Sequence, residues 1–568
     1  MDATVTGRDL PMTVAHRFAA LLGHLSLAAV AAWPLPRVLT THLVGHPMVD
    51  VWNHAWGGWW FLECFRAGVA PLYTRLLGAP SGGYLWYIDP LGASFSMPIV
   101  AVAGPVVAWN LLVWTYLALA SAAGRSLALA LGASPVTAWF GAVATVLSPY
   151  VLSEVHNGIT EAMGVCWAVF ALAALARATR EGARRREWAW LGLWGGLTAV
   201  GTVYYAIGLS LAAAPIVVNH LVRRPRQAAL GVVIAALIST MFAVPAYLAV
   251  HRTLADPALA LIARPNLALD DPWFLGILHH NAADPRAFLL PGEFQSVDVT
   301  PLGEFFRHTS YVGLIVAGLA ACARRPSWLV AAAFPLVFSL GPFLFYDGGW
   351  VRVGSQLVAL PYRLLFEFLP TGALGHPQRV VFPGLALLGA LAALTLARAP
   401  KLVALGATAA MALEFLLVSP APWPIAVSPL PDDDAAEYIR ERVATSPARS
   451  GMVLDLPASV QSQGMTTSRY LMLQTIHRQP IPYGPDVRAS GLKVADEAVH
   501  VLMRRETAAV GEVTADSLAR AGVRFVVTHG DLADTSVEDW ILRRVCAEPR
   551  HFGDVKVYEL AESSASAP

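Results

Sequence analysis

Long apolar stretches alternate with shorter polar connections over the first three quarters of the chain. A helix that spans a membrane needs about 20 mostly apolar residues. Eleven stretches approach this length and several fall short of it, so we expect about eleven spanning helices whose ends extend beyond the apolar residues. These stretches are 18–39, 104–122, 136–152, 162–175, 188–203, 206–221, 228–250, 311–323, 328–345, 380–397 and 402–418.

The basic residues of the connections test this count independently, because cytoplasmic loops of membrane proteins are enriched in Arg and Lys. If the N-terminus lies inside, every short basic cluster falls on the same side, and an odd number of spans leaves the C-terminal region on the other. The sequence therefore predicts a multi-pass protein of an inner (plasma) membrane, with a cytoplasmic N-terminus and a periplasmic or extracellular C-terminal region. The clusters are Arg125; Arg177, Arg180, Arg184, Arg185 and Arg186; Arg223, Arg224 and Arg226; Arg324 and Arg325; and Arg398 and Lys401.

The composition changes after residue 418. A proline-rich linker, stiff and extended, comes first. Beyond it, helical patterns at 435–443 and 515–521 alternate with the strand patterns MVLDLP, VRFVVTH and VKVYEL, which is typical of a small α/β domain. We therefore divide the chain into a transmembrane domain at 1–418 with outer loops 40–103, 251–310 and 346–379, a linker at 419–431, an exoplasmic α/β domain at 432–562 and a disordered tail at 563–568.

Composition supports the membrane assignment and excludes several functional classes. Of the 568 residues 56% are hydrophobic and 14% are charged, against about 25% charged residues in soluble chains. A net charge of +1 gives no reason to expect nucleic-acid binding. The four cysteines are far apart, which argues against a zinc ribbon, a redox dithiol or a disulfide framework. No small-residue cleavage pattern follows the first apolar stretch, so we interpret it as a retained span.

Candidate chemistry gathers on the predicted outer side, first in the stretch GHPMVDVWNHAWGGWW at 45–60. So much indole is typical of a membrane–water interface, since indole is apolar but has one N–H that needs a polar partner. Asp50, with Asn53 and His54 beside it, can act as a general base towards a hydroxyl acceptor or ligate a divalent cation at the mouth of a membrane cavity. An aromatic membrane anchor with an incidental acid explains the stretch about equally well.

A second acid, Asp89, lies in GAPSGGYLWYIDPLGA. It is a candidate second carboxylate facing Asp50, although Asp directly before an apolar helix is more often its N-cap.

The turn SEVHNGITE between two spans contains Glu154, His156, Asn157 and Glu161. Burying an ionised group in lipid costs about 2.5–3.5 kcal/mol, so we expect these side chains to line a cavity. The alternative for Glu161 is an acid that stabilises the first turn of the next helix. Tyr204 and Tyr205 form a further outer turn.

His279, His280 and Asp284 have a spacing that suggests a metal site. Adjacent histidines point in different directions on a helix or strand, so ordinary polar loop residues are the favoured interpretation.

The segment PYRLLFEFLPTGALGHPQRVVF precedes an apolar span. Arg363 and Glu367 are four residues apart and can pair on a short helix. Arg379, with His376 nearby, lies on the outer side, where Arg is disfavoured. Binding of an anionic phosphate and snorkelling at the interface are equal explanations for it. Glu414 lies within the last span and is predicted to face the bundle interior.

Known nucleotide and protease motifs are missing from the sequence. It contains no GxxxxGK[ST], no GxGxxG after a strand, no HExxH and no nucleophile elbow. ATP-driven transport and soluble nucleotide-sugar chemistry therefore lose support.

Eight segments, in order along the chain, resemble those of one family. They are HPMVDVWNHAW, GAPSGGYLWYIDPL, GPVVAWNLLVWTYLAL, SPYVLSEVHNGITE, WGGLTAVGTVYYA, DPRAFLLPG, HPQRVVFPGLALLGALAAL and LARAGVRFVVTHGDL. This pattern resembles the GT-C superfamily of polytopic membrane glycosyltransferases, in particular bacterial members with an exoplasmic C-terminal domain. The resemblance implies a polyprenyl-phosphate-linked sugar donor, transfer on the exoplasmic face, and catalysis by an acid of the first outer loop. Only Asp50 matches that acid, whereas many members carry a pair.

Together these observations predict an α-helical polytopic membrane protein with a small C-terminal α/β domain, acting as an inverting glycosyltransferase. Asp50 would deprotonate the acceptor, which would be a glycan, lipid or protein, with Asp89 as a second candidate acid, and Arg379 would stabilise the departing polyprenyl phosphate. Metal dependence stays open, with Mg²⁺ or Mn²⁺ as the candidate cation. The residues expected to contact substrate are Asn53, His54, Glu154, His156, Asn157, Glu161, Tyr204 and Tyr205.

Two alternatives compete with this prediction. The first is a non-catalytic protein that binds, exports or assembles lipid or polysaccharide on the same scaffold. The second is an ion-coupled transporter, which needs acids near the membrane midplane in paired halves. Glu414 is the one such acid in the predicted spans, so we rank the transporter last.

Overall fold

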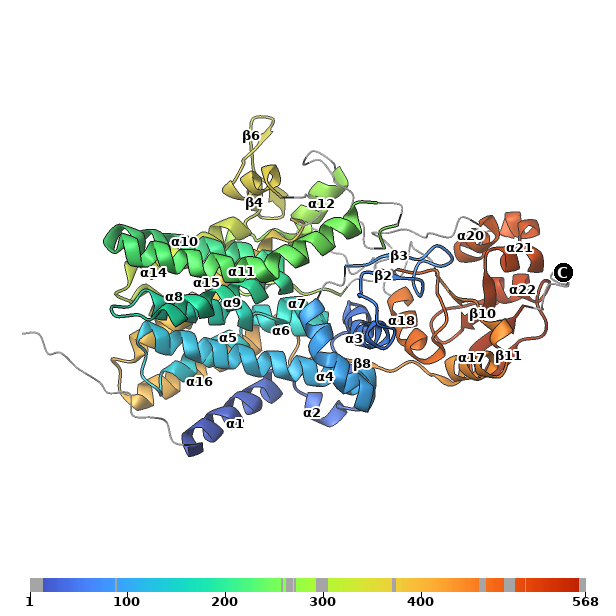
Figure 1. The fold of residues 1–568 in the computed structure, drawn as a ribbon, viewed down its shortest axis with the longest axis horizontal. Coiled ribbons are helices and arrows are strands. Elements are labelled where there is room, and N and C mark those ends of the chain that lie inside the picture. The colour runs from blue at the N-terminus through green and yellow to red at the C-terminus, as the bar shows by residue number, and fades with distance from the viewer. Residues whose placement is uncertain are drawn as a thin grey trace, which may run out of the picture.

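A long helical bundle and a smaller region with a four-stranded sheet form the two ends of the molecule (Figure 1). This computed structural model describes residues 14–86, 89–256, 259–261, 269, 272–292, 305–369, 374–458, 466–484, 496–505 and 507–560. The predicted tail at 563–568 lies outside them.

Eight helical segments in the described residues are long and apolar enough to cross a membrane, which makes this a multi-pass membrane protein. Each of them corresponds to a predicted span. They are α1 (Val14–Ala31), α4 (Pro90–Leu131), α5 with α6 (Ala138–Val146 and Pro149–Asn157), α7 with α8 (Thr160–Met163 and Cys166–Ala178), α10 (Val203–Arg223), α11 (Pro225–Leu254), η5 with α15 (Pro377–Val381 and Phe382–Leu396), and α16 (Lys401–Val418).

The remaining three predicted spans are helices that do not meet these criteria, so the count of eleven is not confirmed. They are α9 (Arg185–Gly201), α13 (Leu314–Ala321) and α14 (Pro326–Ser339). α13 has 8 residues and α14 has 14, which at about 1.5 Å per residue is shorter than a hydrocarbon core of about 30 Å. α9 has 17 residues and begins with two arginines and a glutamate.

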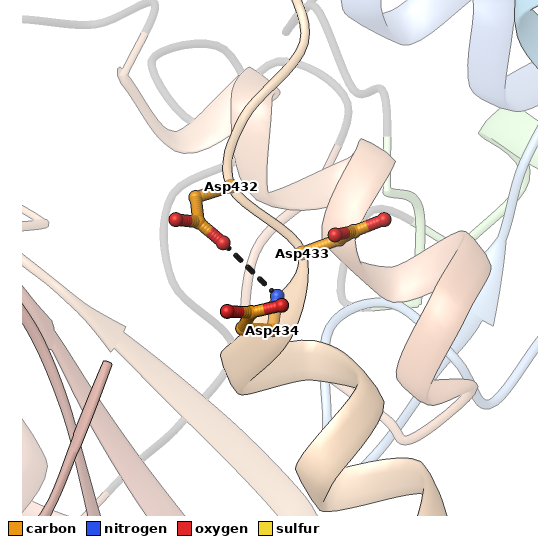
Figure 2. A group of neighbouring side chains, drawn as sticks. All are labelled: Asp432, Asp433 and Asp434. Carbon is orange, nitrogen blue, oxygen red and sulfur yellow. Dashed lines mark hydrogen bonds between the residues drawn. The ribbon is translucent and has the colours of Figure 1, made fainter. Parts of the chain in front are cut away.

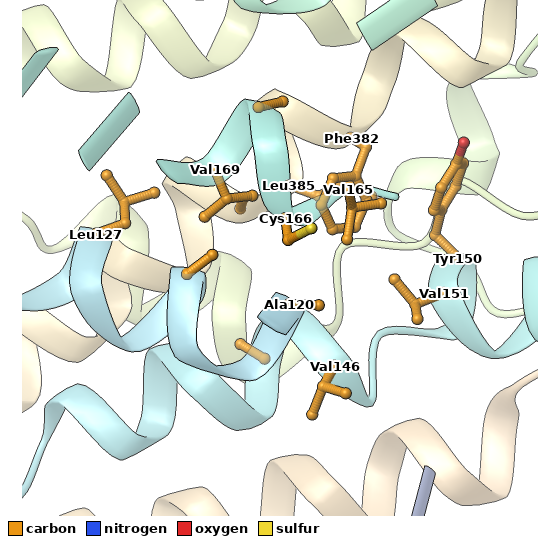
Figure 3. Close-up of a cluster of buried hydrophobic side chains, with 14 of the residues drawn as sticks. Ala120, Leu127, Val146, Tyr150, Val151, Val165, Cys166, Val169, Phe382 and Leu385 are labelled. Atoms are coloured by element: carbon orange, nitrogen blue, oxygen red, sulfur yellow. The ribbon is translucent and has the colours of Figure 1, made fainter. Parts of the chain in front are cut away.

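α4 is longer than its predicted apolar stretch. Its 42 residues contain a break at Gly104, whose φ of 80° interrupts the helix just before Pro105. The sequence prediction began at this break, because the preceding segment is less apolar. Around the second half of α4, small and branched side chains from α5, α6, α8 and α15 make the bundle core, with Ala120, Val146, Val169 and Leu385 among them (Figure 3).

The connection between α1 and α4, which is predicted to lie on the outer side, is more ordered than a loop. It contains α2 (Leu35–Val38), β1 (His42–Val44), α3 (Val51–Arg66) and the hairpin of β2 (Tyr73–Thr74) and β3 (Gly83–Tyr84). β1 pairs antiparallel with β8 (Val427–Pro429), which lies in the predicted linker, with Leu43 opposite Ser428. The linker is therefore held against the bundle by strand pairing.

The two later connections that are predicted to lie on the outer side contain short elements. They are α12 (Pro272–Asn281), η1 (Pro285–Phe288), the hairpins β4–β5 (Phe345–Tyr346, Gly349–Trp350) and β6–β7 (Arg352–Val353, Gln356–Leu357), and η3 (Pro361–Glu367).

The C-terminal region contains the predicted strands in a sheet of order β11-β12-β10-β9. β9 (Met452–Leu456) is parallel to β10 (Val523–His529), whereas β12 (Val555–Glu559) is antiparallel to β10 and to β11 (Arg550–Phe552). The helices are α17 (Asp434–Thr445), η6 (Pro447–Arg449), α18 (Thr466–His477), α20 (Glu497–Arg504), η7 (Thr507–Glu512), α21 (Ala515–Arg520) and α22 (Ser536–Leu542). α18 packs on α3, so the two ends of the molecule share one contact surface (Figure 1).

Candidate active site

α3 places Asp50 directly beside the turn between α6 and α7. Gly158 in that turn has φ +67°, and a Cβ there would lie 2.7 Å from Val51 Cα, so the glycine allows the start of α3 to approach closely. Asp50 occupies the N-cap position of α3, but its side chain makes no capping hydrogen bond. Instead its half-buried carboxylate accepts from Asn53 Nδ2 at 3.4 Å.

His54, one turn further along α3, joins this acid to the α7 segment. Its Nδ1 shares a hydrogen bond of 2.8 Å with Thr160 Oγ1, and its Nε2 lies 3.5 Å from Glu161 Oε2. Burial lowers the pKa of His54 from its usual value, while Asp50 and Asp89 act in the opposite direction. The Nδ1 side of the ring therefore has a hydrogen-bond partner in Thr160, and the Nε2 side lies next to the Glu161 carboxylate.

Arg379 of η5 contacts the same group of side chains, and its partner Glu161 lies 218 residues earlier in the sequence. Its Nη1 donates to Glu161 Oε1 at 3.1 Å, and both side chains are buried. Glu154 of α6 interacts electrostatically with the same guanidinium, and its own Oε2 has no hydrogen-bond partner in the described residues. Arg379 therefore compensates two buried carboxylates.

The two tyrosines after α9 lie next to these groups. The Arg379 guanidinium is 6.0 Å from the Tyr204 ring centre, and the Tyr204 hydroxyl accepts from the His376 backbone N–H at 3.2 Å. The Tyr205 hydroxyl contacts the Tyr150 hydroxyl at 3.0 Å and donates to the Ala162 carbonyl. Both hydroxyls thus hold protein groups in position.

Asp89 is the N-cap of α4, the role that its position before Pro90 favoured. Its Oδ1 accepts from Gly92 N at 2.8 Å, and Tyr116 donates to the carboxylate at 3.2 Å. A Cβ at residue 92 would lie 2.1 Å from Oδ2, so the cap requires glycine. Burial is the main cause of the raised pKa of Asp89. Through Thr160, Asp89 is connected to His54 and so to the network.

His156 and Asn157 hold the segment at 305–307. His156 Nε2 contacts the Phe305 carbonyl at 3.1 Å. The Asn157 side chain donates to the Arg307 carbonyl at 2.7 Å and accepts from the Arg307 N–H at 2.8 Å. The predicted substrate contact of both residues stays a prediction, and their present partners are backbone groups at 305–307.

The tryptophans of α3 do not face a membrane–water interface, contrary to our interpretation of the sequence. Trp52, Trp56, Trp59 and Trp60 are all at most 4% exposed. Trp56 stacks on Trp60 and donates its Nε1–H to Gln474 Oε1 at 2.9 Å. The C-terminal region covers this face of α3 and supplies the polar partner that we had expected from water.

The arrangement of the carboxylates bears on a metal cofactor. Among the described residues, the group of carboxylates close enough together to hold an ion is Asp432, Asp433 and Asp434, at the exposed start of α17 (Figure 2). Asp432 there accepts from the Asp434 backbone N–H at 3.1 Å, which is an ordinary helix-start contact. Asp50, Asp89, Glu154 and Glu161 do not form such a group among the described residues, and a divalent cation at this site stays a prediction.

Two of three other motifs have structural partners. Asp284 accepts from Arg286 and from the Asp347 N–H, whereas the His279 side chain lies outside the described part of the structure. The expected pairing of Arg363 with Glu367 is wrong, because η3 is a 3₁₀ helix, in which residues four apart do not face each other, and no ion pair joins these two described residues. Glu414 accepts from Tyr311 Oη at 2.7 Å and Leu314 N at 2.6 Å, and so fixes the start of α13.

Sequence reasoning missed Thr160, Tyr116 and Gln474. A lone hydroxyl or amide in an apolar setting carries no pattern of its own, and each residue acts through a partner distant in sequence.

Solved structures resemble the chain, whereas no family model and no curated protein sequence matches it. The arabinofuranosyltransferase AftD from Mycobacteria has a TM-score of 0.56 and 17% identity, over 97% of this chain and 40% of the AftD chain. The oligosaccharyltransferase AglB from Archaeoglobus fulgidus, in complex with an inhibitory peptide and a dolichol-phosphate, has a TM-score of 0.52 and 12% identity, over 97% of this chain and 74% of AglB. This chain thus spans less than half the length of AftD. At these identities the likeness shows the fold alone: the chain shares the fold of these two solved glycosyltransferases, as its resemblance to the GT-C superfamily predicted.

Proposed function

We propose that this protein is an integral membrane glycosyltransferase that moves a sugar from a polyprenyl-phosphate-linked donor to an acceptor on the exoplasmic face. The observation that carries the proposal is the position of the half-buried Asp50 beside a buried polar group of His54, Glu161, Glu154 and Arg379. Four separate elements contribute these groups. Buried charges of this kind are expensive unless they have a task, and they cluster at functional sites.

Asp50 is the general base of the proposed reaction. Unlike Asp89, it does not cap its helix, and its carboxylate is the more exposed of the two. Deprotonation of an acceptor hydroxyl by this carboxylate accompanies attack on the anomeric carbon, with inversion, and the polyprenyl phosphate leaves. Asp89 remains a second candidate acid, although its contacts are those of a cap.

Arg379 is the group that stabilises the leaving phosphate. Its bond to Glu161 uses one nitrogen, and Nε has no hydrogen-bond partner in the described residues. A phosphate approaching Nε finds a charge-assisted donor already oriented by the carboxylate. The polyprenyl-phosphate donor is supported further by AglB, whose solved complex contains a dolichol-phosphate.

The non-catalytic alternative also has an observation in its favour. Glu154, Glu161 and Arg379 are at most 7% exposed and already compensate one another. A closed network of this kind also suits a purely structural core of a lipid-binding protein.

Replacement of Asp50 by Asn tests the proposal. We expect transfer from synthetic polyprenyl-phosphate-linked hexoses and pentoses, assayed in proteoliposomes, to fall about 10²–10⁴-fold, the usual contribution of a general base. The control is Asp432→Asn, because Asp432 is an exposed acid on the same predicted side, and thermal unfolding checks that both variants fold. Full activity of D50N would refute the mechanism, and wild-type protein that binds these donors without turnover would establish the alternative.

A further inference from the structure

A cavity of about 280 Å³ lies between the first turns of α9 and α11, at the arginine-rich end of the bundle. The two helices pack side by side (Figure 1). The cavity is remote in sequence from the proposed active site, and none of the network residues lines it. Its lining includes Arg185, Trp188, Arg226, Gln227, Leu230 and Gly231.

Two guanidinium groups at this cavity lack an acidic partner. Arg185 and Arg226 are exposed, and in the described part of the chain neither forms an ion pair. Arg224 nearby differs, because it contacts Glu181 at 2.6 Å. The cavity therefore has a net positive lining.

The backbone adds further donors. α9 has 17 residues and α11 has 30, and neither N-cap, Arg184 or Arg224, forms a side-chain capping hydrogen bond. The first amides of a helix have no acceptor within the helix, and the helix dipole places positive potential there. Helix starts of this kind bind anions through their N–H groups.

A buried indole supplies an independent indication of a ligand. Trp188 lines the cavity and is 2% exposed, and its Nε1–H has no partner in the described residues. The pyrrole ring lies against Gly231, which also lines the cavity, since a Cβ at that position would be 2.3 Å from Cε2 and 2.6 Å from Nε1. Buried donors are nearly always paired in native proteins, so this N–H is an unused donor in the wall of the cavity.

We propose that this cavity binds the phosphate group of an anionic membrane lipid. The apolar span of α11 begins here at Pro225, and Leu230, 44% exposed, gives the cavity an apolar rim towards the acyl chains. Unpaired arginines facing an apolar rim at the end of a membrane span match a lipid headgroup better than a soluble anion. The positive-inside rule predicts that this end is cytoplasmic.

Lipid titration of the purified full-length protein, followed by native mass spectrometry, tests the site. We expect phosphatidylglycerol to bind about tenfold more tightly than phosphatidylcholine, and R185Q/R226Q to remove about tenfold of that affinity, since a charge-assisted hydrogen bond is worth at least one factor of ten. W188F keeps the ring but lacks the N–H, so we expect a smaller loss, about threefold. The matched control is R324Q/R398Q, which removes two exposed arginines from the same predicted side.

Three outcomes would overturn the inference. Equal binding of the two lipids would show that no anionic headgroup is selected. An equal loss in R185Q/R226Q and R324Q/R398Q would show general surface attraction. Displacement of phosphatidylglycerol by inorganic phosphate at equal concentration would identify a soluble-anion site. Loss confined to R185Q/R226Q and W188F supports the lipid site.

Discussion

Arg379 and Glu161 form a buried ion pair whose loss should destabilise the bundle strongly. Their charged atoms are 3.1 Å apart, and the side chains are 8% and 6% exposed. Removing one partner of a buried pair costs about 3–5 kcal/mol, because the other charge stays buried and unpaired. Arg379→Met leaves two carboxylates, Glu161 and Glu154, without their cation. We therefore expect a loss near the upper end of this range.

Replacing the acid of this pair should cost less stability than replacing the arginine. Glu161→Gln leaves Arg379 beside Glu154, so we expect a loss of about 1–3 kcal/mol, that of a charged hydrogen bond. The double variant removes both charges and leaves Glu154 alone unpaired. Its destabilisation should be smaller than the sum of the two single losses by about 2 kcal/mol, a coupling typical of contacting residues.

Equilibrium unfolding in mixed micelles with increasing dodecyl sulfate provides the assay, with the fluorescence of the buried tryptophans as the signal. The control pair is Arg224 and Glu181, which is closer at 2.6 Å but 36% and 88% exposed. Arg224→Met should cost at most about 1 kcal/mol, as exposed pairs do. An Arg379→Met variant that loses no more than Arg224→Met, or single losses that add within about 0.5 kcal/mol, would refute the reasoning.

Two further predictions concern the C-terminal region. Gln474→Ala removes the hydrogen-bond partner of the Trp56 N–H and of the Gln479 carbonyl, so thermal unfolding should show a loss of about 2–6 kcal/mol, since each orphaned group costs about 1–3 kcal/mol. Burial lowers the pKa of His477 to about 4. Between pH 6.5 and 4 the unfolded state therefore binds more protons than the folded state. The free energy of unfolding should fall by about 3 kcal/mol as the pH drops through this window. His477→Asn keeps an acceptor for the Gln479 N–H but cannot titrate, so its unfolding curve should lack this pH dependence; equal slopes for both proteins would contradict the assignment.

Local pattern predicted the long apolar helices and three of the strands. Apolar length identified the eight helical segments of the described residues that are long enough to span a membrane, and β-branched runs identified β9, β10 and β12. The apolar pattern also predicted spans at α13 and α14, but these helices are shorter than the length needed to cross a membrane. The apolar pattern did not predict α3, because polar residues such as Asn53, His54 and Glu63 interrupt its apolar face. The C-terminal region buries this helix, so α3 does not need the continuous apolar face of a helix that contacts lipid.

The candidate site was only partly predictable. Sequence reasoning named Asp50, Glu154, Glu161 and Arg379 individually, from their positions at the ends of spans. It could not pair Glu161 with Arg379, since the two are 218 residues apart and span order does not determine which helix ends meet. Thr160, which connects His54 to Asp89, lies in no recognisable motif.

α3 connects the proposed chemistry to the C-terminal region. Its first residues carry the acid, with Asp50 at the N-cap and His54 one turn later, while Trp56 and Trp60 lie on the face that packs against that region. A helix is rigid over such a short length, so a shift of the Gln474 contact moves the carboxylate as well. Productive geometry tolerates displacements of only about 0.5 Å. The C-terminal region is therefore part of the scaffold that positions Asp50, and the tryptophans are the means by which it does so.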